Sequence, residues 1–239
     1  MISWEGAGPY TVVFSTRAGG VSEGPYESLN LGIFTGDDPN CVIENRRRLA
    51  GGAGIDPERT RMAWQQHGPE VRRVSPEGIL TPGTQHEPCD GWWSNEPGQG
   101  MMLVTADCLP VAIARRDGDR PALAVLHVGW RGLLAGIVAS GVSALGEGPL
   151  GSAIGPGIGP CCYEVGTDLA DPFATRFGSE VLTDGRLDLW RATELALMDA
   201  GVDEVERTDL CTYCHPDLFF SHRRDRGTTG RQGVIAAVA

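Results

Sequence analysis

Three side chains in this sequence are soft or borderline metal ligands, and each stands just past a predicted strand: His67, Cys108 and His127. One thiolate and two imidazoles around a single ion leave a fourth position for water, which is the arrangement of catalytic rather than structural zinc. Copper in electron-transfer sites takes the same ligand types. The spacing alone does not bring the three residues together, so this metal site is a hypothesis that the fold must support.

Two of these ligands lie in Met101–Gly132, the stretch around which the rest of the chain is expected to be organised. It contains three short apolar runs rich in Val, Ile and Leu, which are typical of strands buried on both faces. Asp107 and Cys108 end the first run and His127 ends the last, so the reactive side chains are predicted at strand ends. Asp107 is the candidate proton carrier, although adjacent strand residues face opposite ways.

An anion site is predicted where this stretch ends. Glycines after His127 lead into a run with apolar residues at helical spacing, from Leu134 to Leu145. The free backbone N–H groups at a helix start favour an anion, and Arg131 adds a full positive charge there. We therefore assign Arg131 to the catalytic set, with Cys108 and Asp107.

The charge of the chain restricts its ligands. A net charge of −11 argues against a general nucleic-acid or anionic-membrane binder, because such proteins need a basic face. All 20 basic residues are arginine, and the lack of lysine excludes Schiff-base lysine chemistry and the lysine-dependent P-loop. An anionic ligand must be held locally, as arginines can do for phosphate. The residues expected to contact substrate are Arg17, Asn45, Arg46, Gln65 and Arg224.

Hydrophobic periodicity and turn residues predict the elements around these side chains. Residues 75–88 are expected to form a loop in which His86 has no role, and residues 154–166 a rigid loop of alternating glycine and proline. The predicted strands outside the central stretch are Tyr10–Phe14, Met62–Gly68, Val71–Val74 and Val234–Val238, and the predicted helices are residues 38–52, Leu169–Phe177 and Trp190–Ala200.

The seven cysteines are scattered rather than spaced as a disulfide framework, which favours reduced thiols. Cys211 and Cys214 have the C-x-x-C spacing of a zinc ribbon. A ribbon needs a second pair of comparable spacing, and Cys161 and Cys162 are adjacent instead. We therefore predict no zinc ribbon in this chain.

Length and composition predict one α/β domain over residues 1–239, because the chain contains no linker-like segment. We expect a mixed β-sheet with helices packed around it and the site at the carboxyl ends of the strands. The amino terminus lacks the features of a signal peptide, and no run is long enough to span a membrane. A soluble, cytoplasmic protein is therefore expected, of unassigned oligomeric state.

The chain closely resembles the YfiH-like laccase-domain family in a series of segments, in this order: FSTRAGGVS, ENR, QQHG, TADCLPV, HVGWRG, IGPGIGPCCYEVG and CTYCHPDLFFSHRRDRGTTGRQ. Members of that family are described as purine nucleoside phosphorylases and as the peptidoglycan editing factor. The His of its QHG motif, the Cys of its ADC motif and the His of its H-x-GWRG motif bind zinc. The resemblance therefore implies that His67, Cys108 and His127 are zinc ligands. The visible departure is Val128, where many relatives have alanine.

The resemblance implies phosphorolysis of adenosine, inosine and methylthioadenosine, and hydrolytic deamination of adenosine. Zinc lowers the pKa of bound water to about 7, which makes hydroxide available to attack the purine C6. Phosphorolysis needs an anion clamp that brings phosphate to the sugar carbon, and Arg131, Arg46 and Arg224 are the expected members. The implied partners are a purine nucleoside and phosphate.

The same residues are compatible with other functions. A zinc amidase that removes wrongly incorporated serine from a peptidoglycan precursor would use the same hydroxide on an amide carbonyl. A copper-dependent polyphenol oxidase is disfavoured, since five histidines are few for several coppers. A metal-free enzyme would use Cys108 as nucleophile and His127 as base, although the neighbouring Asp107 disfavours a thiolate. A binding module that only senses purines is the non-enzymatic alternative.

Overall fold

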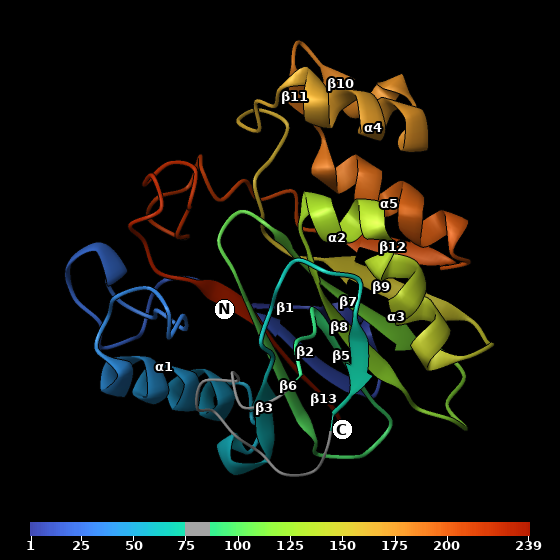
Figure 1. The fold of residues 1–239 in the computed structure, drawn as a ribbon. Coiled ribbons are helices and arrows are strands. Elements are labelled where there is room, and N and C mark those ends of the chain that lie inside the picture. Colours follow the sequence, from blue (N-terminus) through green and yellow to red (C-terminus); the bar gives the residue numbers. More distant parts are fainter. Residues whose placement is uncertain (75–86) are drawn as a thin grey trace.

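The computed structural model describes residues 1–74 and 87–239. The predicted loop over 75–88, with His86, therefore lies almost wholly outside the described residues. Two mixed β-sheets form the centre of the fold (Figure 1). The five-stranded sheet has the order β1-β2-β13-β6-β3. Its strands are β1 (Ile2–Ser3), β2 (Tyr10–Phe14), β13 (Gln232–Val238), β6 (Gly100–Thr105) and β3 (Thr60–Met62).

The six-stranded sheet has the order β12-β9-β7-β8-β5-β4. Its strands are β12 (Glu204–Arg207), β9 (Leu150–Ile154), β7 (Leu109–Arg115), β8 (Leu123–Val128), β5 (Gly91–Ser94) and β4 (Val71–Arg73). A small hairpin, β10 (Leu182–Thr183) and β11 (Arg186–Leu187), stands apart from both sheets. The fold is thus α/β with mixed sheets, as predicted, but the single expected sheet is in fact two.

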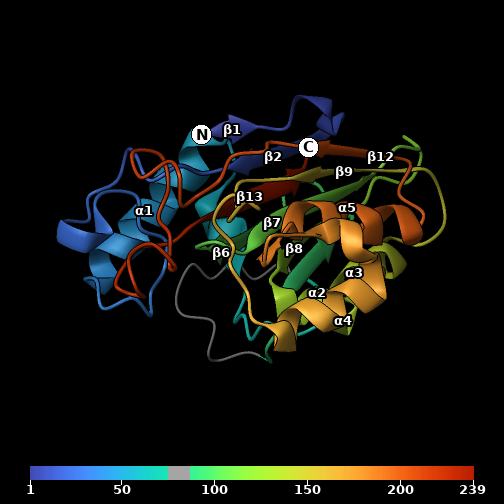
Figure 2. The same cartoon turned by 90° about the horizontal axis from the view of Figure 1, so that it is seen from above.

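Helices cover the outer faces of both sheets (Figures 1 and 2). One helix, α1 (Pro39–Gly52), lies beside the five-stranded sheet. Over the six-stranded sheet lie α2 (Trp130–Ala135), α3 (Ile137–Leu145) and α5 (Leu189–Asp199), and α4 (Thr167–Phe177) packs on α2 and α5. Short 3-10 turns cover Glu5–Ala7, Gly24–Tyr26, Pro57–Arg59 and Ser179–Val181. No helix in the described ranges has the length and apolar character that crossing a bilayer requires.

The alternation of side chains along β7 explains why its sequence is apolar throughout. Val111 and Ile113 pack into the core beneath the helices, whereas Ala112 and Ala114 pack into the core between the two sheets. Successive strand residues point to opposite faces, so a strand covered on both sides has no polar face. This confirms the prediction of doubly buried strands in the central stretch.

Two predicted elements differ in length from those observed. The run after His127 forms two helices rather than one, because Gly136 adopts a left-handed conformation with φ 93° between α2 and α3. The strand expected over Met62–Gly68 ends at Met62. The following residues form a loop whose polar backbone is bound by side chains of other segments, as described below.

Candidate metal centre and adjoining cavity

The three predicted metal ligands come together at one end of the six-stranded sheet. Cys108 directly precedes β7 and His127 lies near the end of β8; the two strands are antiparallel, with Leu109 opposite Val128. The loop after β3 brings His67 to the same place, where its ring centroid lies 4.7 Å from that of His127. The ligand atoms of His67, Cys108 and His127 all lie within 4.8 Å of one another. One ion can therefore contact all three.

Asp90, which directly precedes β5, holds both histidines in position. Its Oδ1 lies 2.7 Å from Nδ1 of His127, which leaves the other ring nitrogen for a metal. The same carboxylate accepts the backbone N–H groups of Gln66, His67 and Gly68 at 2.8–2.9 Å. These bonds support a loop in which His67 has a φ of 61°, a region that few non-glycine residues adopt. Carboxylates commonly orient metal-binding histidines in this way.

Gly129 provides the space in which Cys108 and His67 meet. A Cβ atom at this position would lie 2.9 Å from Sγ of Cys108 and 3.2 Å from Cδ2 of His67. Side-chain atoms do not pack this closely without displacement. A glycine directly after β8 is therefore a steric requirement of the ligand cluster.

The electrostatics of the cluster favour a thiolate. Burial opposes ionisation of Cys108, but His127 and His67 outweigh it and lower the thiol pKa to about 6. Burial likewise disfavours protonation of His127, but Cys108 and Asp90 outweigh it and raise its pKa to about 9. The expectation that Asp107 would disfavour a Cys108 thiolate is thus wrong, because the two imidazoles dominate the surroundings of the sulfur.

Asp107 has a left-handed backbone, with φ 86°, and its carboxylate points to the C-terminal segment. Oδ1 accepts a hydrogen bond from the Thr212 hydroxyl at 2.7 Å, and Oδ2 accepts one from the backbone N–H of Arg223 at 2.7 Å. Both oxygens are therefore engaged. This geometry suits anchoring of the C-terminal loop better than the proton transfer assigned to Asp107 from the sequence.

A cavity of about 580 Å³ opens beside the three ligands. Its volume is in the range of small-molecule sites. Three arginines line it, Arg46 from α1 and Arg223 and Arg231 from the segment before β13, together with apolar and aromatic side chains. The residues that line it are Gly32, Ile33, Phe34, Thr35, Arg46, Met62, Ala63, Trp64, Gln65, Gln66, His67, Val104, Thr105, Ala106, Asp107, Cys108, His127, Trp130, Ile158, Tyr163, Leu189, His222, Arg223 and Arg231.

Two of the predicted substrate contacts line this cavity. Arg46 is buried on α1, donates to the carbonyl of Leu31, and has a pKa lowered to about 10 by burial. Gln65 also faces the cavity, but its amide exchanges two hydrogen bonds with the backbone of Val104 in β6. It thereby ties the His67 loop to the five-stranded sheet.

The structure does not bring the other predicted contacts to the wall of this cavity. Arg17 donates to the carbonyls of Glu27 and Pro216. The Asn45 amide bridges loop residues 21–30 to α1. Arg224 pairs with Asp225 and donates to loop carbonyls. All three therefore hold together the segments that carry cavity residues.

Arg131, predicted as part of an anion clamp, is likewise absent from the cavity lining. Its side chain is exposed and its guanidinium lies over the ring of Trp130, 4.8 Å from the centroid. The helix α2 begins one residue earlier, at Trp130, and has only six residues. The positive charge at the cavity comes instead from Arg46, Arg223 and Arg231.

Several cavity residues were not singled out from the sequence. Phe34 is 70% exposed although it is large and apolar, and Tyr163 and Trp130 lie in the wall. Arg231 appeared only within the last of the segments that carry the family resemblance. Asp90 was given no role, because the strand that it precedes, β5, was not predicted. Nothing in the local pattern indicates which remote residues these side chains meet.

The two cysteine pairs, which the sequence argument rejected as a metal site, come together in the structure. The ligand atoms of Cys161, Cys162, Cys211 and Cys214 lie within 4.8 Å of one another. The sequence argument failed because it required both pairs to have similar spacing. Two adjacent cysteines on a bent loop place their sulfurs beside those of a C-x-x-C pair equally well.

Comparison with known proteins identifies the family. The family model described as multi-copper polyphenol oxidoreductase laccase matches residues 11–239. The chain belongs to this YfiH-like laccase-domain family. Purine nucleoside phosphorylase YfiH of Escherichia coli K12 is 38% identical over 229 residues, which cover 91% of this chain and 89% of that protein. Purine nucleoside phosphorylase YlmD of Geobacillus stearothermophilus is 37% identical over 237 residues, covering 91% and 86%.

Solved structures of the YfiH-like family share the whole fold. The hypothetical protein YfiH of Bacillus licheniformis matches with a TM-score of 0.93 at 32% identity, over 100% of this chain and 96% of that one. YlmD of Geobacillus stearothermophilus matches with a TM-score of 0.89 at 34% identity, over 98% and 94%. The names of the relatives support an enzymatic role, and the family together with the His and Cys donors indicates a metal.

Proposed function

We propose that this protein is a zinc-dependent purine nucleoside phosphorylase that acts on adenosine, inosine and methylthioadenosine and also deaminates adenosine. The observation that carries the proposal is that the His67, Cys108 and His127 cluster and three arginines face one cavity of about 580 Å³. The names of the relatives point to the same reaction class. We further propose that the protein works in the cytoplasm.

The donor set fits zinc. One thiolate and two imidazoles, with Asp90 behind His127, match the ligand types of catalytic zinc sites and their supporting carboxylates. When bound there, zinc supplies a Lewis acid that lowers the pKa of a water molecule and stabilises negative charge. Among the described histidines, only His67 and His127 belong to a group able to hold a metal. This number is small for the several coppers of an oxidase.

The arginines of the cavity suit phosphate. Arg231 is mostly buried, and burial lowers its pKa while the negative charges of Asp107 and Cys108 oppose that change. Arg231 lines the same cavity as the three metal ligands, so its guanidinium can bind an anion beside them. Arg46 and Arg223 add charge from α1 and the C-terminal loop. Guanidinium groups bind phosphate through paired, charge-assisted hydrogen bonds.

In phosphorolysis, a phosphate oxygen forms a bond to the sugar C1′ while the bond from C1′ to the purine nitrogen breaks. The products are ribose 1-phosphate and the free purine, and the base takes up a proton. The arginines would hold the attacking phosphate, and the apolar wall that includes Phe34, Trp130 and Tyr163 would hold the base by stacking. Deamination exchanges the C6 amino group for oxygen from water and releases ammonia.

Product analysis with adenosine, with and without phosphate, tests this proposal. We expect phosphate-dependent release of adenine with ribose 1-phosphate, and phosphate-independent formation of inosine. Cys108→Ser should lower both rates at least about 100-fold. Cys41→Ser, near the start of α1 and not among the residues that line the cavity, should leave them unchanged.

A second pair of variants tests the arginine assignment. Arg231→Gln should raise the KM for phosphate about 10-fold or more. Arg226→Gln, an exposed residue of the same loop that does not line the cavity, should not. Release of serine from a peptidoglycan precursor without any nucleoside turnover, or phenol oxidation on adding copper, would overturn the proposal.

A further inference from the structure

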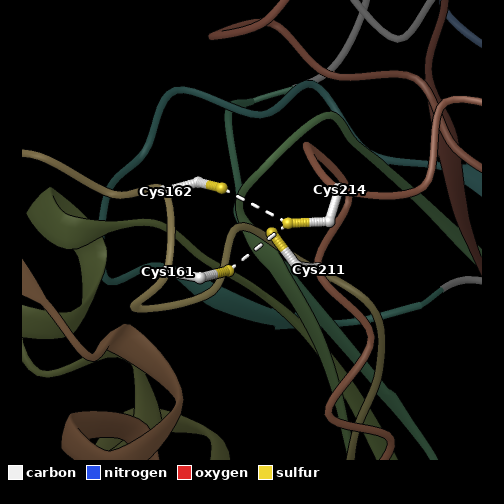
Figure 3. A group of neighbouring side chains, drawn as sticks. All are labelled: Cys161, Cys162, Cys211 and Cys214. Carbon is white, nitrogen blue, oxygen red and sulfur yellow. Dashed lines mark hydrogen bonds between the residues drawn. The ribbon is translucent and has the colours of Figure 1, made fainter.

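A second group of metal-ligand side chains lies outside the cavity, in two loops that lie next to each other. Cys161 and Cys162 belong to the glycine- and proline-rich loop after β9, and Cys211 and Cys214 to the segment after β12 (Figure 3). All four side chains point their sulfur atoms into one small space (Figure 3). We propose that these four cysteines bind a structural zinc ion.

The backbone of the two loops positions the two cysteine pairs. Gly157 forms a parallel bridge with Cys211. The Gly157 N–H donates to the carbonyl of Leu210, and its carbonyl accepts the N–H of Thr212. This short ladder fixes the C-x-x-C pair against the start of the turn that carries Cys161 and Cys162. The donor cluster therefore follows from backbone pairing and does not rest on chance side-chain rotamers.

The distances between the sulfur atoms fit a tetrahedral zinc site. Sγ of Cys214 lies 3.5 Å from that of Cys161 and 3.4 Å from that of Cys162, and all four lie within 4.8 Å of one another. With zinc–sulfur bonds of about 2.3 Å, tetrahedral geometry places sulfurs about 3.8 Å apart. A small adjustment of the side chains is enough to complete such a site.

The same distances argue against a disulfide as the resting arrangement. Cys214 is nearly equidistant from Cys161 and Cys162, so no single partner is selected. A disulfide would also leave two thiols of the cluster without a bonding partner. An ion with four sulfur ligands uses every member of the group.

Backbone donors around Cys211 add a second observation. Its Sγ accepts the N–H of Gly159 at 3.2 Å, and also hydrogen bonds from the backbones of Tyr213 and Cys214. Such N–H groups stabilise a negatively charged sulfur and orient it, as supporting contacts do in metal sites. Because four protein ligands leave no open position, the site is structural and not catalytic.

The proposed ion would join two loops that carry parts of the cavity. Tyr163, which follows Cys162, lines the cavity, and Thr212, between the ligands of the second pair, donates to Asp107. Zinc at the cysteine cluster would therefore stabilise the wall of the cavity without touching the substrate. This inference does not depend on which reaction the cavity supports.

Metal analysis of protein purified under reducing conditions tests the inference. We expect two zinc ions per chain in the unchanged protein and in the Cys41→Ser control. The variant His67→Ala/Cys108→Ser/His127→Ala should keep one ion, and X-ray absorption should show four sulfur neighbours at about 2.3 Å. The variant Cys161→Ser/Cys214→Ser should also keep one ion, with a mixed sulfur and nitrogen shell.

The variant His67→Ala/Cys108→Ser/His127→Ala leaves the four cysteines intact. It therefore tests the structural site even if the variant Cys161→Ser/Cys214→Ser does not fold. No metal in the variant with the four cysteines intact, or a metal with nitrogen or oxygen neighbours, would overturn the structural site whatever the fate of the catalytic proposal. Mass spectrometry showing a disulfide between Cys214 and Cys161 or Cys162 in the reduced preparation would also overturn it. Conversely, four-sulfur coordination without phosphorolysis would support this site and contradict the proposed reaction.

Discussion

Asp90 is the residue on which the geometry of the metal centre depends most. It accepts three backbone N–H groups of the His67 loop and contacts the His127 ring. Burial raises the energy of its carboxylate, but the hydrogen bond and charge of His127 outweigh this, and the pKa of Asp90 is lowered. An ionised carboxylate is therefore maintained inside the protein beside the two histidines.

Asp90→Asn should lower the zinc affinity about 10- to 100-fold, because loss of a supporting carboxylate has this effect in metal sites. The amide cannot accept on both atoms, so the His67 loop loses part of its support. Titration against a coloured chelator measures the affinity. Asp119→Asn, an exposed residue on the turn before β8, is the control, and equal affinities of the two variants would contradict this role.

Gly129→Ala tests the steric argument for the ligand cluster. The added Cβ would lie 2.9 Å from Sγ of Cys108, so the sulfur or the His67 ring must move. We expect metal content to fall by more than half while circular dichroism stays unchanged. Gly118→Ala, where nothing lies within 4 Å of the new atom, should bind metal normally. Full metal content in Gly129→Ala would show that the cluster tolerates the side chain.

Residue types predicted the metal ligands better than the substrate contacts. A thiolate and two imidazoles at strand ends suggest a metal from their chemistry alone, and the structure brings these three together. Arginines carry no such signature, because a guanidinium binds loop carbonyls as readily as phosphate. Arg17 and Arg224 bind loop carbonyls without lining the cavity. Arg231 also donates to loop carbonyls, those of Thr229 and Gly230, yet it lines the cavity.

At the scale of elements, the C-terminal loop between β12 and β13 carries two ligands of the cysteine group, Cys211 and Cys214, and two arginines that line the cavity, Arg223 and Arg231. Arg224 and Thr229 hold it through Asp225, whose carboxylate accepts hydrogen bonds from both side chains. Burial opposes ionisation of this carboxyl, but these bonds outweigh it and lower the pKa of Asp225. The ionised form therefore stabilises the loop.

Asp225→Asn should lower the melting temperature at pH 7 by about 2–4 °C, corresponding to about 1 kcal/mol for a partly exposed ion pair. Because the folded-state pKa is below the unfolded one, this stabilisation is present above the unfolded pKa of about 3.9 and is lost as the pH falls through the folded value. Melting curves of both proteins from pH 7 down to pH 3 should converge. A constant difference across that range would assign the effect to something other than the carboxylate charge.

Elements with strong periodicity were predicted well, and those determined by remote contacts were not. The helix over 38–52 matches α1 closely, and Tyr10–Phe14 matches β2. The segment after Met62 looks like a strand from its composition, but Asp90 and Val104 bind its backbone and side chains in a loop. Gly136 split a predicted helix because its left-handed conformation is not visible in the apolar spacing.

At the scale of the whole molecule, the sheets share one core. Side chains of β2, β6 and β13 pack against those of β7 and β8 between the two sheets. We therefore propose that residues 1–239 form a single domain, as their length also suggests. The sequence predicted two-sided burial but not the second sheet, because periodicity shows that both faces are covered without showing what covers them.

Removal of β13 should unfold both sheets. Every residue of this strand is buried, and it pairs with β2 and β6. Burial of Val234, Ile235 and Val238 alone contributes about 1.5–3 kcal/mol each, compared with about 5–15 kcal/mol for total stability. A chain ending at Arg231 should lack cooperative unfolding, whereas one lacking only the exposed Ala239 should fold. A folded six-stranded sheet in the shorter chain would contradict a single domain.

The central claim is that His67, Cys108 and His127 bind one zinc ion beside the cavity. An anomalous difference map, recorded above and below the zinc absorption edge on crystals grown without added metal, tests this claim most directly. We predict a peak within about 2.0–2.3 Å of Sγ of Cys108 and of one nitrogen of each imidazole. The absence of a peak there, or a peak bonded to only one of the three residues, would contradict the account.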